Sequence, residues 1–137
     1  MVSYHYQSEF QKDDTYTIRR PIVPLNINGF PFTGLLDSGS DVIVIPTEVA
    51  DALNLETGSK EIISQMNGDE MPCRLTNINI EFGTTKNPYN FKAKALISDS
   101  SRIILGRVGF FDNFRITFDE FNKKVHFKPN KENTFFN

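Results

Sequence analysis

The stretch Leu35-Leu36-Asp37-Ser38-Gly39-Ser40-Asp41, continued by Val42-Ile43-Val44-Ile45-Pro46, decides how this chain folds. Two apolar residues lead into an acid, which is followed by a hydroxyl, a glycine, a second hydroxyl and another acid, and then by four apolar residues. The pattern predicts a carboxylate at the end of a buried strand, on a tight turn, with another strand after it. An unpaired ionised carboxylate is costly to bury, so Asp37 needs a specific role. Gly39 allows a backbone geometry that a Cβ would obstruct, and the flanking serines offer hydroxyls for local hydrogen bonds.

The loop resembles the catalytic loop of aspartic proteases, which reads hydrophobic-hydrophobic-Asp-Thr/Ser-Gly-Ser/Ala. A second segment, Ile103-Ile104-Leu105-Gly106-Arg107, resembles the block that follows in the retroviral-type, single-lobe members, the retropepsins. The two blocks have the order and the separation found in that family, and the likeness spans roughly Pro21 to Pro129. The resemblance implies an all-β, closed β-barrel-like fold with one or two short helices, active as a symmetric homodimer.

Composition adds few constraints to this interpretation. The chain has 137 residues, enough for one domain with a real core. We expect an N-terminal arm at 1–17, a retropepsin-like aspartic protease domain at 18–129 and a C-terminal tail at 130–137. The net charge of -2 gives no basic footprint for nucleic acid. No apolar run could span a membrane, and no signal peptide is evident, so we expect a cytoplasmic protein, whether or not it is part of a longer one.

The segment before the loop reads as a β-hairpin. Residues 22–27 alternate apolar and polar side chains, which predicts a strand with one solvent-facing side. Asn28-Gly29 is a strong two-residue hairpin signal. Phe30 to Leu36 is therefore the expected return strand, and it delivers Asp37 at its end.

After the loop we expect the buried strand Val42–Ile45 and then a short helix that starts at Pro46-Thr47-Glu48, with Thr47 as N-cap. The buried face of that helix is expected to carry Val49, Ala52 and Leu53. Further expected elements are a hairpin over Glu61–Leu75, strands at Thr76–Phe82 and Phe91–Ile97, a small helix within Val108–Phe114 and a closing hairpin over Arg115–Lys128. For residues 1–14, an extended arm with an apolar edge and a partly ordered tail both remain open.

The chain supplies one catalytic carboxylate. Asp99-Ser100-Ser101 lacks the glycine and the following apolar strand of a second catalytic triplet, so we interpret it as a connecting turn. Peptide hydrolysis without a metal or a nucleophile needs an acid and a base on opposite sides of one water. Two carboxyls that share a proton provide both. A two-fold axis beside Asp37 would bring its own copy into contact, which is why a homodimer is expected.

The resemblance also assigns roles to the residues around the loop. Asp37 is the catalytic residue of each chain, Ser38 would bond across to the partner loop, and Gly39 would present its carbonyl to the substrate. The remaining support of the catalytic loop would come from Ser40, Asp41, Gly106 and Arg107. Asp41 and Arg107 would form an interface ion pair. Removing one partner of such a buried pair leaves the other charge unpaired and costs roughly 3–5 kcal/mol, so Arg107→Ala is expected to abolish the dimer or the fold.

Substrate contacts are expected from the hairpin around Asn67-Gly68. The family has a mobile flap there, whose tip would be Met66, Asn67 and Gly68, although an ordinary surface hairpin fits the same sequence. The tip also lacks the glycine-rich character of retroviral flaps. Val44, Ile45 and Ile104 fit either substrate pockets or plain core. A peptide or protein substrate would lie extended between loop and flap.

Two rival chemistries find no second support in the sequence. A cysteine hydrolase would pair Cys73 with His5 or His126, but no nucleophile turn surrounds Cys73. Two distant histidines and one cysteine make no metal site, and no cofactor is expected. The main alternative to an aspartic endopeptidase is a catalytically silent retropepsin-like dimerisation or peptide-binding module. A third is a protease that becomes active only after processing or when fused to other domains.

Overall fold

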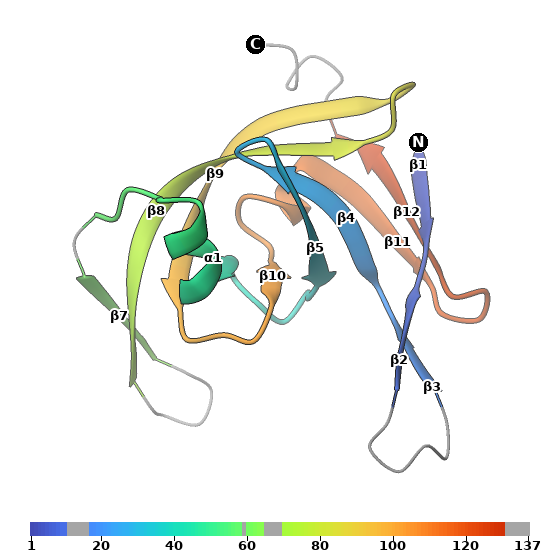
Figure 1. Cartoon of the computed structure of the whole chain (residues 1–137). Helices are drawn as coiled ribbons and strands as arrows, with labels where there is room; N and C mark the ends of the chain where they lie inside the picture. Colours follow the sequence, from blue (N-terminus) through green and yellow to red (C-terminus); the bar gives the residue numbers. More distant parts are fainter. Residues whose placement is uncertain (11–16, 59, 65–69, 131–137) are drawn as a thin grey trace.

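The structure is a computed structural model that describes residues 1–10, 17–58, 60–64 and 70–130 (Figure 1). Strands dominate these ranges, with one short α-helix and one 3-10 turn. In chain order the elements are β1 (Val2–His5), β2 (Gln7–Phe10), β3 (Thr17–Arg20), β4 (Ile22–Ile27), β5 (Phe30–Leu36), β6 (Ile43–Pro46), α1 (Thr47–Ala52), β7 (Lys60–Ser64), β8 (Glu70–Gly83), β9 (Pro88–Ser98), β10 (Ile103–Leu105), η1 (Phe111–Asn113), β11 (Phe114–Asp119) and β12 (Lys124–Pro129).

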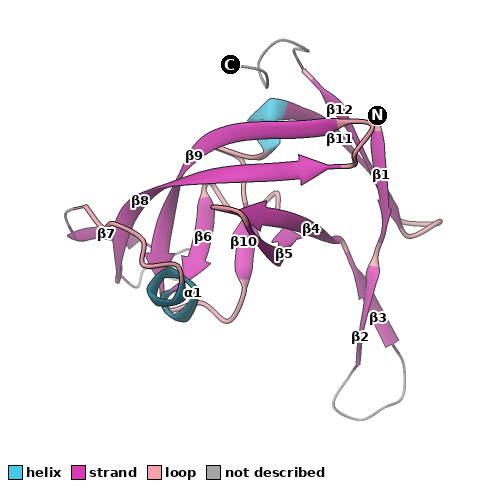
Figure 2. Ribbon diagram, turned by 45° about the horizontal axis from the view of Figure 1, so that its top comes forward, coloured by secondary structure: helices cyan, strands magenta, loops and turns pink. Residues whose placement is uncertain are grey.

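Six strands close into a barrel in the order β4-β5-β10-β6-β9-β8, because β4 also pairs with β8. β7 adds to the outer side of β8, and together they extend away from the barrel (Figure 2). Alternate residues of each strand fill the interior: in β4, for example, Val23, Leu25 and Ile27 are buried while Pro24 is exposed. The expected closed, mostly-β architecture is therefore confirmed.

The β4–β5 hairpin forms as the sequence predicts. Asn28 and Gly29 both have positive φ, 50° and 86°, as a type I′ turn requires. Asn28 also anchors the turn to the barrel, because its side-chain oxygen accepts a hydrogen bond from the backbone N–H of Asn79 at 2.8 Å. β5 therefore starts from a fixed point and ends one residue before Asp37.

A second sheet, of order β1-β12-β11, packs on the barrel through an aromatic cluster. Phe82 of β8 is at its centre, with ring centroids 4.8 Å from Phe127, 5.3 Å from Phe110 and 5.7 Å from Phe114, all edge to face. The sheet is built within the chain, since Val2 of β1 pairs with Phe127 of β12. Residues 2–5 thus form a paired strand, and not a partly ordered tail.

The helix differs from its prediction in two details. Pro46 occupies the N-cap, and Thr47 is the first helical residue, with its hydroxyl donating to the Ser98 carbonyl at 3.3 Å instead of capping the helix. β6 pairs with β9 and sets Pro46 opposite Ser98, so a tertiary acceptor is at hand. The buried position is Ala50, not Ala52, which points outward.

The β2–β3 hairpin projects from the opposite side of the barrel to β7 (Figures 1 and 2). The Glu9 carboxylate connects this hairpin to two arginines. Glu9 Oε1 accepts a hydrogen bond from Arg102 Nη1 at 2.8 Å, and Glu9 Oε2 lies 3.2 Å from Arg20 Nε. The hydrogen bond from Arg102, supported by the charges of Arg102 and Arg20, lowers the pKa of Glu9 below its ordinary value. Glu9 thus links the hairpin to the residue just before β10.

Glu9→Gln should destabilise the protein at neutral pH by less than about 1 kcal/mol, because all three side chains are partly exposed. A carboxyl whose pKa is lower in the folded state stabilises that state above the unfolded-state pKa and loses this effect as the pH falls through the folded value. The difference between wild type and variant should therefore vanish in acid. Urea unfolding of both proteins across a pH series would measure it, and a difference that grows in acid would contradict the assignment.

Candidate active site

Asp37 begins the loop between β5 and β6, and backbone hydrogen bonds fix it there. Its own N–H donates to the Leu105 carbonyl at 3.1 Å, and its carbonyl accepts from the Ser40 N–H at 3.1 Å. The Gly39 N–H donates to Asp37 Oδ1 at 2.9 Å. The turn that follows Asp37 therefore orients its carboxylate through Oδ1, and this hydrogen bond does not involve Oδ2.

The two sequence blocks meet at this loop. β10 lies between β5 and β6, parallel to β5, with Leu105 opposite Leu36. Beyond β10, the Arg107 N–H donates to the Ser40 carbonyl at 2.9 Å, and the Val108 N–H donates to the Asp41 carbonyl at 2.8 Å. The segment that follows β10 is thus hydrogen-bonded to the backbone of the candidate catalytic loop.

Gly106 is required by close backbone approach. A Cβ at this position would lie 2.1 Å from the Val42 carbonyl oxygen and 2.7 Å from the Ser40 carbonyl oxygen. Both atoms belong to the loop backbone, so neither can rotate away as a side chain would. Gly106 therefore sets the distance between the two blocks.

The two serines of the loop have different surroundings. The Ser40 hydroxyl donates to the Val42 carbonyl at 2.8 Å and stabilises its own loop. Ser38 is exposed, as is Gly39. In a single chain, the face of the loop that carries Ser38 is open.

The ion pair between Asp41 and Arg107 is present, with Asp41 Oδ1 3.7 Å from Arg107 Nη1. It is not buried within the chain: the side chains are 88% and 66% exposed. An exposed pair contributes little to the stability of one chain, so we no longer expect Arg107→Ala to abolish the fold, and the loss of the dimer stays a prediction. The sequence could not reveal this, because no pattern distinguishes an ion pair that is exposed on one chain from a pair buried in its core.

A row of apolar side chains runs outward from Asp37 across the sheet. Strand pairing places Leu35 opposite Ile104, Ile104 opposite Val44, Val44 opposite Leu96, and Leu96 opposite Leu75. We call this row, which consists of Leu35, Ile104, Val44, Leu96 and Leu75, the apolar stripe.

The stripe lies on the face of the sheet opposite to the core. The strand neighbours of Leu35, Ile104 and Val44 include the core residues Leu36, Leu105 and Ile43. Side chains alternate along a strand, so the stripe must point the other way. All its members are half-buried except Leu96, which is buried.

The sequence left open whether Val44, Ile45 and Ile104 form substrate pockets or plain core, and the answer differs among the three. Ile45 is fully buried in the core, while Val44 and Ile104 belong to the stripe. Sequence reasoning missed Leu35, Leu96 and Leu75. The alternation in Leu35-Leu36-Asp37 could have indicated Leu35, because it places Leu35 on the same face as the acid.

The remaining predicted site residues fall into two groups. The flap-tip candidates Met66, Asn67 and Gly68 lie outside the described residues. The two strands that flank them, β7 and β8, are paired, with Lys60 opposite Arg74 and Ser64 opposite Glu70. Asp99 to Ser101 form the connection between β9 and β10, as expected of a turn.

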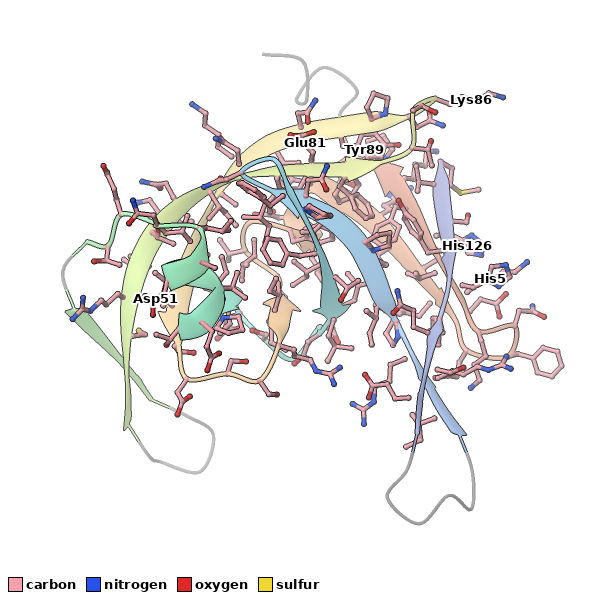
Figure 3. All side chains as sticks on the ribbon, viewed as in Figure 1. His5, Asp51, Glu81, Lys86, Tyr89 and His126 are labelled. Atoms are coloured by element: carbon pink, nitrogen blue, oxygen red, sulfur yellow. The ribbon has the colours of Figure 1, made fainter. Side chains whose placement is uncertain are left out.

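The geometry also argues against a cysteine hydrolase. His5 and His126 lie on β1 and β12 of the second sheet (Figure 3), whereas Cys73 is buried in β8 of the barrel sheet. His126 Nδ1 instead lies 2.6 Å from the Ser3 hydroxyl. Across the described ranges, no cluster of three or more His, Cys, Asp or Glu is placed to hold a metal. Of the helices described, none has the length and apolar character of a membrane span.

Comparisons with known proteins agree with this geometry. Residues 23–108 match the family described as "gag-polyprotein putative aspartyl protease". Among solved structures, EIAV protease complexed with the inhibitor HBY-793 is similar, with a TM-score of 0.52 and 28% identity over 64% of this chain and 82% of that one. No curated protein sequence matches the chain. The matched residues run from the β4–β5 hairpin through both blocks of the site, and the chain therefore belongs to the retroviral-type, retropepsin-like family of aspartyl proteases.

Proposed function

We propose that the chain is an aspartic endopeptidase that works as a symmetric homodimer, with Asp37 of each chain at a shared site. The observation that supports this most directly is the loop itself. It presents one oriented carboxylate at the end of the apolar stripe, and its Ser38 face is exposed in a single chain. A second copy would supply the second carboxylate and cover that face.

The chemistry needs both carboxyls. Like charges a few Å apart cannot both ionise cheaply, so the pair would hold one proton and titrate as a unit. The charged carboxylate takes a proton from water as the water oxygen attacks the peptide carbonyl carbon. The neutral carboxyl gives its proton to the carbonyl oxygen. Collapse of the resulting diol breaks the C–N bond, and a proton passes to the leaving nitrogen.

The surface around the loop has features of an interface. Val108 is 62% exposed although it is apolar, and it is the residue whose N–H binds the Asp41 carbonyl. Asp41 and Arg107 add an exposed ion pair beside it. An exposed apolar side chain with charged neighbours is compatible with contact to another protein surface, and the two-fold arrangement would bring two copies of this site together.

Substrate would lie extended along the apolar stripe. An extended peptide places alternate side chains on one face, which matches a surface built from paired strands. Met66, Asn67 and Gly68 would close over it as the tip of the β7–β8 hairpin. The apolar character of Ile104 and Val44 favours apolar substrate side chains next to the scissile bond.

The proposal is tested by combining sedimentation with a cleavage assay. Sedimentation velocity over a concentration series should show a monomer–dimer equilibrium. Cleavage of an unstructured protein at mildly acidic pH should follow the dimer fraction, so that the rate per chain rises with chain concentration. A dimer that cleaves nothing would indicate the silent binding module, and cleavage by a strict monomer would overturn the shared site.

Arg107→Ala should weaken the dimer by about tenfold or more, because it leaves Asp41 unpaired at the proposed interface. The single chain should lose less than about 1 kcal/mol of stability, because the pair is exposed there. Sedimentation and urea unfolding at low concentration separate the two effects. Arg115→Ala removes an exposed charge from β11 and is the matched control. An unchanged dimer in the Arg107 variant would contradict the interface assignment.

A further inference from the structure

A pocket of about 270 Å³ lies where the β2–β3 hairpin meets the strands that position Asp37. Its wall includes Glu9 of β2, Leu35 of β5, and Arg102 with Ile103 at the start of β10. Leu35 is also the end of the apolar stripe. The pocket therefore continues the proposed substrate surface on the side away from β7.

The register of β5 sets the distance from this pocket to the reacting centre. Leu35 precedes Asp37 by two residues, and alternation places both on the same face of the strand. Two residues of a strand span roughly 7 Å. An extended substrate has the same repeat, so the side chain that enters this pocket would belong to a residue close to the scissile bond.

Two charged residues, Glu9 and Arg102, line the pocket, and Arg20 contacts Glu9 from outside the lining. Glu9 Oε1 accepts a hydrogen bond from Arg102 Nη1 at 2.8 Å, and Glu9 Oε2 forms an ion pair with Arg20 Nε at 3.2 Å. The cluster of Glu9, Arg20 and Arg102 therefore carries one net positive charge beside the pocket, although the pocket lining itself holds one Glu and one Arg. The Arg102 side chain is 36% exposed. Its guanidinium carries several N–H donors beyond the one that Glu9 accepts, and a planar fork of donors fits a carboxylate well.

We propose that this pocket is a substrate subsite that selects a carboxylate side chain, Glu or Asp, next to or near the scissile bond, with Arg102 as the specificity-determining residue. The inference rests on the proposed proteolytic function. Arg102 would bind the substrate carboxylate with charge-assisted hydrogen bonds. Glu9 acts through Arg102: it holds the guanidinium at the pocket wall and keeps the hairpin against β10.

The experiment uses the wild-type chain and peptides identified by cleavage of an unbiased library. Each position within about three residues of the bond, a span set by the strand repeat, is varied among Glu, Gln and Lys. The assay is run about one to two units above the ordinary pKa of Glu, so that the peptide carboxylate is ionised. At one position, kcat/KM for the Glu peptide should exceed that for the Gln peptide by about tenfold.

Variants of Arg102 and a salt series test whether Arg102 causes that preference for Glu over Gln. Arg102→Gln should bring the Glu/Gln ratio to about one, whereas Arg102→Lys, which keeps the charge, should retain part of the preference. Arg19→Gln removes the same charge from an exposed position on the same hairpin and should change nothing. Added salt should reduce the ratio in the wild-type protein, a test that does not depend on how the variants fold.

The outcomes separate the two proposals. Cleavage without a Glu preference at any position would overturn the subsite and leave the proteolytic function standing. A Glu preference that survives in Arg102→Gln, or that salt does not alter, would also overturn it. Absence of any cleavage by the dimeric wild-type protein would reject both proposals together.

Discussion

Asp37→Asn should reduce peptide cleavage by about a thousandfold or more while leaving the fold intact. An amide cannot take a proton from water, so the shared site would lose its general base. The two side chains could also no longer share a proton as two carboxyls do. The fold should survive because an amide oxygen can still accept the Gly39 N–H, now 2.9 Å from Asp37 Oδ1. Cleavage of a fluorogenic peptide measures the first effect, and thermal unfolding measures the second.

Asp99→Asn is the matched control for this variant. Asp99 is exposed and is also followed by a serine, but it lies in the connection between β9 and β10 and lacks the glycine of the loop. The control should cleave like the wild type. Adding an excess of the Asp37→Asn chain to wild-type chain should lower the activity, because mixed dimers hold one carboxylate. Activity that survives in the variant would remove the basis of the mechanism.

Much of the barrel could be predicted because its signals are local. Asn28-Gly29 fixes a turn, and alternation fixes the faces of β4, so the hairpin that delivers Asp37 follows from a short stretch of sequence. The contact between the two blocks was not local. It could be expected only through the resemblance, which assigned Gly106 and Arg107 to the support of the loop; the parallel pairing of β5 with β10 was not predicted.

The features that could not be predicted depend on tertiary partners. Thr47 reads as an N-cap, but β6–β9 pairing places the Ser98 carbonyl within its reach. Glu9, Arg20 and Arg102 are scattered charges in the sequence, and they meet only because the hairpin folds against β10. The exposure of Asp41 and Arg107 likewise depends on the surface that surrounds them. Sequence patterns define which face of an element is apolar, but not what approaches the polar face.

Gly106→Ala should cost about 3 kcal/mol of folding stability or more, at the upper end of overpacking effects, and should also remove activity. The added methyl would lie 2.1 Å from the Val42 carbonyl oxygen, well inside van der Waals contact. To relieve this clash the loop must move away from β10. That movement would strain the hydrogen bond from the Asp37 N–H to the Leu105 carbonyl and the one from the Arg107 N–H to the Ser40 carbonyl.

Gly58→Ala is the control that distinguishes this clash from a general effect of replacing glycine. A Cβ at Gly58 would lie 3.5 Å from the Leu75 carbonyl oxygen, an ordinary contact. This variant should unfold close to the wild type, whereas the Gly106 variant should unfold at clearly lower urea and temperature. If the Gly106 variant were equally stable but inactive, the loop would have moved without loss of folding energy. If it were stable and active, the close approach of the two blocks would not be needed to orient Asp37, and the site geometry would have to be revised.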